Sequence, residues 1–246
     1  METFPEAISQ MERAFAEIAA LVPMPQMVEV GGRQAYRFQE KTAQQGVIVK
    51  LVSIVSALRS AQALLRLGMV NEVSILERVV NDHTEDVSFL CLGIAGGQGE
   101  LHEKFLAALF QEEFELRNGI PHVIKRQGSP TRKDIRSYID RAGSVDLSPG
   151  KHAELMRDAA QVYSGFVHGS AVAALNLYGG APGRFHLAGM MGTPRIEVHM
   201  KSLWNHYHRG INAFLFAATV LNLPTTASRL RIFRVGFERL AGKHYE

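Results

Sequence analysis

The stretch Val47–Leu65 reads VIVKLVSIVSALRSAQALL and decides the fold class. Its apolar side chains recur at steps of three and four residues, as they do along one side of an α-helix. It belongs to a longer run, 35–67, that contains no proline and one glycine. We therefore predict one long buried helix over 35–67 that ends near Gly68.

The same periodicity continues on both sides of this helix. Apolar residues at 8, 11, 15, 18 and 21 predict an amphipathic N-terminal helix, and the prolines and paired glycines of 22–33 predict a connector after it. Asn71 is a suitable cap for the next helix. Further helices are predicted over 72–92, 100–117, 131–142, 149–178, 196–221 and 225–240, with 118–130 as a loop.

These segments predict an all-α protein, a single-domain multi-helix bundle of about eight helices over 1–246. Within it, 1–33 would be the N-terminal helix and connector, and 34–246 the bundle. The one clear interruption is a Gly/Pro-rich loop or short hairpin near 179–195, since Gly179–Pro194 holds five glycines and two prolines. Its centre, Arg184–Leu187, is expected to be a short extended piece.

Composition favours a soluble globular chain, with 46% hydrophobic and 21% charged residues among 246. The single cysteine, Cys91, excludes an internal disulfide framework and a multi-cysteine zinc site. Four glutamates in the first 20 residues are not typical of a signal peptide. The run 210–228 is apolar but interrupted by Asn, Pro and Thr, so we predict no membrane span and a cytoplasmic protein.

Charge differs between the two halves of the chain. Residues 1–123 carry 10 Lys and Arg against 16 Asp and Glu, whereas 124–246 carry 17 against 8. The basic half could form a face for anions or nucleic acid. Alternatively, the acidic half packs against the basic half inside one domain. We favour the second interpretation because dedicated nucleic-acid binders are usually more basic overall.

The common catalytic and metal-binding motifs are absent. There is no phosphate-binding glycine loop with Lys-Ser/Thr, no dinucleotide fingerprint and no His-Glu-x-x-His. Glu197, His199, His206 and His208 lie close in sequence, but only His199 and His206 would share a helix face. Because no Glu-x-x-His string occurs either, we predict neither a metal nor another cofactor.

Polar residues on either side of the predicted interruption are the candidates for binding. Two glycines four residues apart, Gly165 and Gly169, would lie on one face of a helix and let a ligand or another helix approach the backbone beside His168. His168 could also be a hydrogen-bonded core histidine, and the sequence favours that interpretation. The candidate binding residues are Tyr163, Gly165, His168, Gly169, Arg184, His186 and Arg195.

Several strings carry a family resemblance. Tyr163–Gly169 reads YSGFVHG, and 177–180, 184–187 and 193–196 follow it as LYGG, RFHL and TPRI. Together with LRSAQALL (58–65) and LERVVNDH (76–83), they resemble a bacterial all-helical family of unassigned function, over roughly 38–221. That family is distantly similar to the HEPN-like helical group (higher eukaryote and prokaryote nucleotide-binding), which includes RNA-cleaving toxins and phage-defence proteins.

The HEPN-like resemblance implies a catalytic string of Arg, four to six residues, then His. Arg78–His83 fits this string, as do 117–122 and 239–244, although composition alone predicts about two such matches. In such ribonucleases Arg78 would stabilise phosphate charge, His83 would be the general acid/base, and two subunits would build one site. A five-residue step, however, turns the second side chain about 140° away on a regular helix.

Three functional hypotheses follow. The first is a non-catalytic HEPN-like binding or regulatory module for a nucleotide, RNA or protein partner, which uses the 165–169 face and the 179–194 loop. The second is a metal-independent endoribonuclease of toxin or phage-defence type, acting as a homodimer through Arg78 and His83. The third is a metal-dependent hydrolase that uses His168, His186 and His199.

Overall fold

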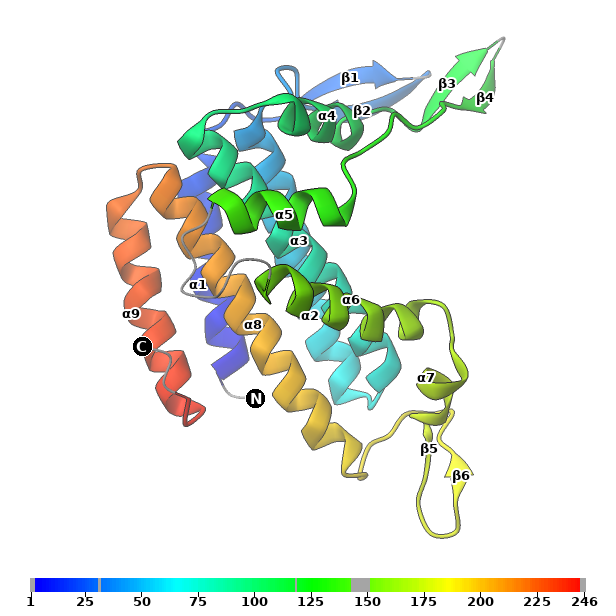
Figure 1. The fold of residues 1–246 in the computed structure, drawn as a ribbon. Coiled ribbons are helices and arrows are strands. Elements are labelled where there is room, and N and C mark those ends of the chain that lie inside the picture. Colours follow the sequence, from blue (N-terminus) through cyan, green and yellow to red (C-terminus); the bar gives the residue numbers. More distant parts are fainter. Residues whose placement is uncertain (1–2, 31, 118, 143–150, 244–246) are drawn as a thin grey trace.

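The computed structural model describes residues 3–30, 32–117, 119–142 and 151–243, and within them the chain is mainly helical (Figure 1). Helices α2, α3 and α8 pack against one another at the centre, α1 and α9 cover α8 on one side, and α5 and α6 contact α3. The predicted all-α bundle is confirmed. The helices are α1 (Thr3–Ala19), α2 (Ala43–Arg66), α3 (Val70–Gly96), α4 (Glu100–Leu109), α5 (Arg132–Ala142), α6 (Lys151–Val167), α7 (Ala171–Leu175), α8 (Arg195–Val220) and α9 (Pro224–Leu240).

The long apolar helix α2 has defined ends. Thr42 and Gln45 form a capping box at its start, where the Thr42 hydroxyl accepts from the Gln45 amide and the Gln45 side chain accepts from the Thr42 amide. The helix stops at Leu67, and Gly68 follows with φ +78°, as predicted. Its predicted start at residue 35 was wrong, because that part of the chain belongs to a strand.

Two hairpins project from the same end of the bundle (Figure 1). One pairs β1 (Gln26–Val30) with β2 (Arg33–Arg37), and the other pairs β3 (Phe114–Arg117) with β4 (Ile120–Val123). The prediction of a helix through residue 117 was wrong, and the predictions of a connector over 22–33 and of a loop over 118–130 were wrong where these strands form. Residues 124–130 form a loop, as predicted. These strands are only four or five residues long, and β1, β2 and β3 carry charged residues, so the apolar alternation that predicts strands is weak in them.

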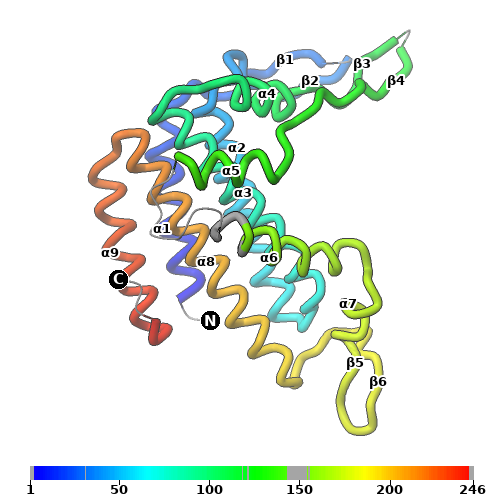
Figure 2. The backbone as a smooth tube through the Cα atoms, viewed as in Figure 1, coloured from blue at the N-terminus to red at the C-terminus, as the bar shows by residue number. Residues whose placement is uncertain are grey.

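The third hairpin belongs to a projecting segment after α6. The predicted helix over 149–178 ends early, at Val167, and its expected start at 148–149 lies outside the described residues. Ser170 caps the short helix α7, and β5 (Tyr178–Gly179) then pairs with β6 (Arg184–Phe185). The short hairpin predicted near 179–195 is thus confirmed. We call residues 171–191 the arm, because they extend away from the central helices (Figure 2).

Helix α8 holds the bundle together through two aromatic residues. Tyr207 stacks on Phe4 of α1 with ring centroids 4.3 Å apart and donates its hydroxyl to the Leu58 carbonyl of α2 at 3.3 Å. Trp204, the one tryptophan of the chain, lies parallel to the ring of Phe237 of α9 at 5.0 Å. These contacts bring α1, α2 and α9 onto α8.

By length and composition α2 could cross a membrane, and it is the one described helix that could. It lies outside 210–228, the run of the sequence that is nearest to a membrane span by its apolar content. In the structure α2 packs between α3, α8 and α1, and residues such as Leu51, Ile54 and Leu58 are fully buried in the core. This is the position of a core helix and is compatible with a soluble protein.

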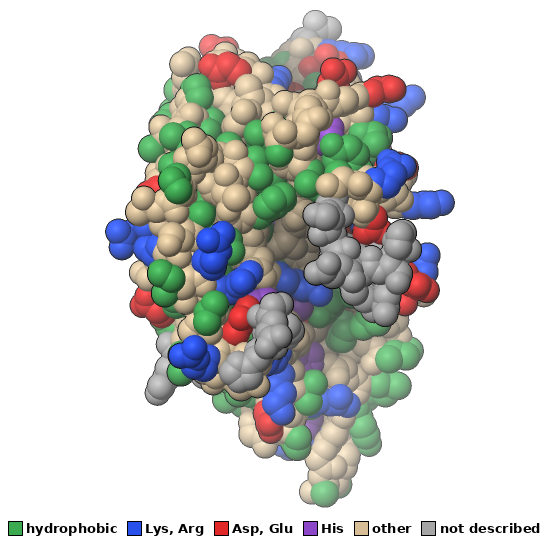
Figure 3. All heavy atoms as spheres, turned by 60° about the vertical axis from the view of Figure 1, so that its left-hand side comes forward, with side chains coloured by type: hydrophobic (Ala, Val, Ile, Leu, Met, Phe, Trp, Pro, Cys, Tyr) green, Lys and Arg blue, Asp and Glu red, His purple; other side chains and the backbone are tan. Residues whose placement is uncertain are grey.

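Charged side chains are mixed on the face of the bundle that Figure 3 shows. Lys and Arg lie among Asp and Glu there and do not gather into one continuous basic field. The acidic first half of the chain also contributes to the core beside the basic second half, since α2 and α3 pack against α8. The mixed charges on this face fit the interpretation that the acidic and the basic half of the chain pack together inside one fold.

Candidate functional site

The predicted catalytic pair lies on α3, but the two side chains have different partners. Arg78 Nη1 donates to the Ala160 carbonyl of α6 at 3.4 Å, and its Nε lies 3.7 Å from the Asp82 carboxylate. His83 Nδ1 lies 3.7 Å from the Asp86 carboxylate. Among the described residues no contact joins Arg78 to His83, which agrees with the rotation of a regular helix over five residues.

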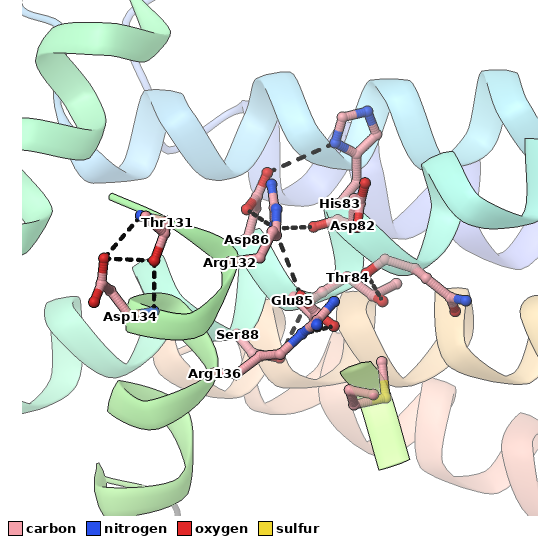
Figure 4. Close-up of polar contacts among 12 residues, drawn as sticks. Asp82, His83, Thr84, Glu85, Asp86, Ser88, Thr131, Arg132, Asp134 and Arg136 are labelled. Carbon is pink, nitrogen blue, oxygen red and sulfur yellow. Dashed lines mark hydrogen bonds and ion pairs between the residues drawn. The ribbon is translucent and has the colours of Figure 1, made fainter. Parts of the chain in front are cut away.

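Asp86 is the centre of a buried ionic network (Figure 4). Its side chain is fully buried, with Lys50 Nζ of α2 2.9 Å from Oδ2 and Arg132 Nη1 of α5 2.7 Å from Oδ1. The same Arg132 nitrogen donates to the Asp82 carbonyl at 3.0 Å. One carboxylate on α3 therefore fixes both α2 and α5.

A second arginine of α5 extends this network along α3. Arg136 Nε donates to Glu85 Oε1 at 2.9 Å, and both side chains are almost completely buried. Arg132 Nη1 lies 3.7 Å from the other Glu85 oxygen (Figure 4). Helix α5 has little apolar surface, so these paired charges replace much of the apolar packing that usually docks a helix.

The pKa values within the network follow from the balance of burial and charge. Burial by itself would raise the pKa of Asp86, but the contact with His83 and the charges of Arg132 and Lys50 outweigh it and lower that pKa to about 2. Burial also raises the pKa of Glu85, and the bond from Arg136 offsets this effect only in part. Asp86 is thus a permanent anion at neutral pH.

A second buried polar cluster joins α3, α6 and α8. His206 Nδ1 donates to the Ser202 carbonyl at 2.9 Å and lies 3.4 Å from the Glu77 carboxylate, which is also buried. The Tyr163 hydroxyl lies 3.4 Å from the Ser202 hydroxyl, and its ring meets the His206 ring edge to face. Burial and the charge of Glu77 raise the pKa of Tyr163 to about 12, so its phenol stays protonated.

A third polar cluster attaches the arm to the bundle. Asn71 Nδ2 donates to the Ala173 carbonyl of α7 at 2.9 Å, and Asn176 Nδ2 donates to Asn71 Oδ1 at 3.0 Å. The prediction that Asn71 caps α3 was therefore wrong: Met69 occupies the cap position, and Asn71 binds the arm. His199 completes the cluster, with Nε2 3.4 Å from Asn176 Nδ2 and Nδ1 3.5 Å from the Ser74 hydroxyl.

The two glycines around His168 do not form the packed helix face that the sequence suggested. Helix α6 ends at Val167, and Gly169 follows with φ +63° and no atom within 4 Å of an added Cβ. Gly165 faces the Ser170 hydroxyl, which would be 3.0 Å from such a Cβ. His168 is exposed, so its interpretation as a core histidine was wrong. The glycines shape the turn that leads into the arm.

The other candidate binding residues lie on the arm or next to it. Arg184 of β6 and Arg195, the first residue of α8, are exposed. His186 is partly buried, and its Nε2 lies 3.2 Å from the Gly179 carbonyl across the hairpin. Tyr163 is separate from them, since it belongs to the buried cluster between α6 and α8.

Large apolar side chains are exposed along the arm and the elements that flank it. Leu187 is 85% exposed and Val172 81%, values far outside the range of core residues. Other exposed apolar residues of the segment are Val162, Val167, Leu175, Tyr178, Phe185, Met191 and Val198. Scattered exposed apolar residues are ordinary, but nine within one sequence segment form a surface that usually has a partner.

Among the residues that it describes, the structure brings no set of metal ligands together. Within the described ranges, no group of three or more His, Cys, Asp or Glu side chains could hold a metal ion. His168 and His186 belong to the turn and the arm, whereas His199 is buried beside Ser74. The hypothesis of a histidine-based metal hydrolase has no geometric support in this part of the chain.

Comparison of the chain with models of protein families finds no match, and comparisons with curated proteins and with solved structures find none either. The HEPN-like resemblance therefore stays an expectation from the sequence.

Proposed function

We propose that this protein is a non-catalytic, cytoplasmic binding module that docks another protein through its arm. The exposed apolar surface of residues 162–198 carries this proposal. Phe185 and Leu187 stand at the hairpin and are 53% and 85% exposed, and Val172 and Leu175 of α7 continue the surface. Large apolar side chains that are exposed in such number within one segment are typical of protein-protein contacts.

The charge of this segment narrows the kind of partner. Residues 162–198 contain one carboxylate, Glu197, which pairs with Lys201 at 2.8 Å, and two permanent cations, Arg184 and Arg195, which are both exposed. A partner that offers apolar anchors and carboxylates would match this surface. Two arginines are few for RNA, whose affinity comes mainly from many phosphate contacts. A protein partner is therefore the better match.

The attachment of the arm supports a binding role as well. Asn71 and Asn176 tie α7 to α3, and the Met190 amide donates to the Gly68 carbonyl at 2.8 Å. The arm is thus held at both of its ends. A surface that is ordered before binding loses less conformational entropy when the partner docks.

The ribonuclease hypothesis has weaker support. Arg78 and His83 contact different carboxylates, and Arg78 also contacts α6. A catalytic pair would have to meet at one phosphate. Without movement of α3 or a contribution from another subunit, these two side chains have no common substrate position.

The docking proposal predicts that two charges placed on the arm weaken partner binding strongly. A photo-crosslinking residue in place of Val172 would first identify the partner in the native cell. Phe185→Glu together with Leu187→Glu should then weaken binding of the purified partner by about 100-fold, because central apolar anchors each contribute about 1–2 kcal/mol or more. Isothermal titration calorimetry measures the change.

A matched pair on α9 serves as the control for this test. Ile232 and Leu240 are 73% and 76% exposed, so Ile232→Glu with Leu240→Glu adds the same charge elsewhere. The control should bind as the unchanged protein does. Equal affinity of the arm variant, or equal loss in the α9 variant, would contradict docking through the arm. Sedimentation of the purified chain shows whether the partner is a second copy.

A separate experiment tests catalysis. We expect the purified protein to leave a mixed RNA pool uncut, both with and without EDTA, because Arg78 and His83 lie apart. The readout is gel electrophoresis of the pool beside the Arg78→Ala/His83→Ala variant. EDTA-resistant cleavage that disappears in this variant would instead establish a metal-independent ribonuclease.

A further inference from the structure

A cavity of about 590 Å³ lies at the opposite end of α3 from the arm, beside the buried ionic network. It is lined by residues of α2, α3 and α4, of the β3–β4 hairpin and of the segment that leads into α5. Lys50, Asp86 and Arg132 form its polar side. The arm contributes no residue to this cavity, so the site is independent of the proposed docking surface.

The wall opposite the network is held in place by side chain to backbone bonds. Gln111, just after α4, donates to the Lys125 carbonyl at 2.8 Å and accepts from the Gln127 amide at 2.7 Å. Thr131 and Asp134 form reciprocal bonds at the start of α5. The segment between β4 and α5 is thereby fixed over the cavity, which gives it a defined shape.

Positive charge exceeds negative charge in the described ion pairs of this network. Lys50, Arg132 and Arg136 are matched by Glu85 and Asp86, while Asp82 pairs with Arg78. The Lys50 side chain is only 12% exposed. Three cations therefore share two carboxylates, and an additional anion beside Lys50 and Arg132 would improve the charge balance.

Both cations beside the cavity retain hydrogen-bond donors. Lys50 has three N–H donors, and one carboxylate oxygen, Asp86 Oδ2, lies within reach of them. In the described part of the chain, the hydrogen bonds of Arg132 all use Nη1, which leaves Nε and Nη2. A guanidinium edge next to an ammonium group is well suited to a carboxylate or a phosphate.

Apolar side chains form another part of the cavity wall. Phe105 is buried below it and Lys50 Nζ lies 5.7 Å from its ring centroid, while Leu109 and Ile124 are partly buried at the sides. Phe114 and Val123 stand at the rim, 52% and 76% exposed. A ligand of matching chemistry would carry an apolar or aromatic body beside its charge.

Carboxylates at the rim do not cancel this preference. Arg37 of β2 binds Glu112 in a bidentate contact, at 2.5 and 2.8 Å, so that carboxylate is already neutralised. Glu113 is well exposed, and Arg126 lies 3.9 Å from it. Since both members of this rim pair are in water, their field is strongly screened compared with that of Lys50.

We propose that this cavity binds a small organic oxyanion, a carboxylate or phosphate monoester with an apolar body. The charged group faces Lys50 and Arg132, and the body packs on Phe105, Leu109 and Ile124. Asp86 positions both cations and does not touch the ligand. This binding site belongs to the protein in addition to the docking of a partner by the arm.

Binding of simple probes tests the site on the full-length chain. Phenyl phosphate and benzoate should both bind in calorimetry at low ionic strength, and the tighter of the two identifies the preferred oxyanion. Phenol, which lacks the charge, and inorganic phosphate, which lacks the body, should bind about tenfold more weakly or not at all. Absence of binding by both aromatic anions at millimolar concentration would refute the site.

Two neighbouring alanines of α4 provide a matched pair of variants. Ala108 lines the cavity, whereas Ala107 points to solvent. Ala108→Trp should fill the cavity and abolish binding of the aromatic anion, and Ala107→Trp should leave it unchanged. Both substitutions leave the ionic network intact, so the comparison does not depend on its stability. Undiminished binding by Ala108→Trp would place the ligand elsewhere.

The charge contribution is tested by Lys50→Met, which keeps an unbranched apolar side chain as far as Cε and removes the ammonium group. Affinity for the better anion should fall by about tenfold or more, because one cation of the pair is lost. Binding of phenol should not change. Circular dichroism verifies that the variant is folded, and if it is not, Arg132→Gln replaces it. Equal anion affinity in a folded variant would overturn the assignment of the charged side.

Discussion

Asp86→Ala is expected to lower the free energy of unfolding by about 3–5 kcal/mol, because removing one partner of a buried ion pair leaves the other charge without compensation. Here a single carboxylate is shared by Lys50 and Arg132, so the substitution strands two cations at once. Helix α5 would lose one of its main attachments to α3, and the smaller side chain would also leave a void.

Urea denaturation followed by circular dichroism measures this loss. Asp82→Ala on the same helix is the matched control, since Asp82 is partly exposed and lies 3.7 Å from Arg78. We expect the control to cost less than about 1 kcal/mol, as partly exposed pairs usually do. If both substitutions cost the same, the buried network would not hold the helices as described.

The pH dependence of stability provides a second readout for Asp86. The pKa of Asp86 is about 2 in the folded protein, whereas that of an unperturbed aspartate is 3.8, so folding favours the ionised form. The contribution of ionised Asp86 to the free energy of unfolding is fully present above pH 3.8 and is lost as the pH falls through about 2. The unchanged protein should therefore lose stability between these values more steeply than Asp86→Ala does.

Gly189→Ala is the substitution with the second largest expected effect. Gly189 has φ +102°, and an added Cβ would lie 2.4 Å from the Leu67 carbonyl oxygen, a backbone atom that cannot turn aside. We expect the strained backbone and the overlap together to cost about 3 kcal/mol or more locally. The hydrogen bond from the Met190 amide to Gly68 should open, and hydrogen exchange at that amide should accelerate.

Gly192 provides the control for this substitution. It also has a positive φ, +79°, but no atom lies within 4 Å of an added Cβ. Gly192→Ala should therefore show only the conformational cost, about 1–2 kcal/mol, and keep the Met190 amide protected. Similar exchange rates in the two variants would mean that the close backbone contact does not attach the arm.

The sequence predicted the central helices well because burial imposes a regular pattern on them. α2 and α8 present apolar residues to the core at helical spacing, and their predicted ends differ little from the observed ones except at residue 35. The hairpins were missed for the opposite reason. β1 and β2 are partly or fully exposed along their length, so no buried face imposes alternation on their residues.

The buried polar clusters could be predicted only in part. Ser74, Glu77, Asn81 and Glu85 recur at steps of three and four along α3, in line with its apolar residues, and this spacing indicates polar groups on a buried face. Their partners come from elsewhere in the chain, as Arg136 does for Glu85 and His206 for Glu77. Pairing over such distances depends on the tertiary arrangement, which periodicity does not contain.

Predictions for the binding residues failed where a helix end was misplaced. Continuing the helix through His168 put Gly165 and Gly169 on one face and buried the histidine, whereas the helix ends at Val167. The two glycines mark a change of chain direction after α6. The sequence prediction had interpreted their spacing as a close crossing of two helices. Arg184 and His186, placed in a loop or hairpin from the start, are found in that hairpin or next to it.

The stacking of Trp204 against α9 makes the protein its own fluorescent reporter. Because the chain has one tryptophan, all indole emission comes from the contact between α8 and α9. Circular dichroism instead averages over every helix. In Asp86→Ala, coincident transitions of the two signals would show that the bundle unfolds as one cooperative unit, and an earlier dichroism transition would show that α5 melts first.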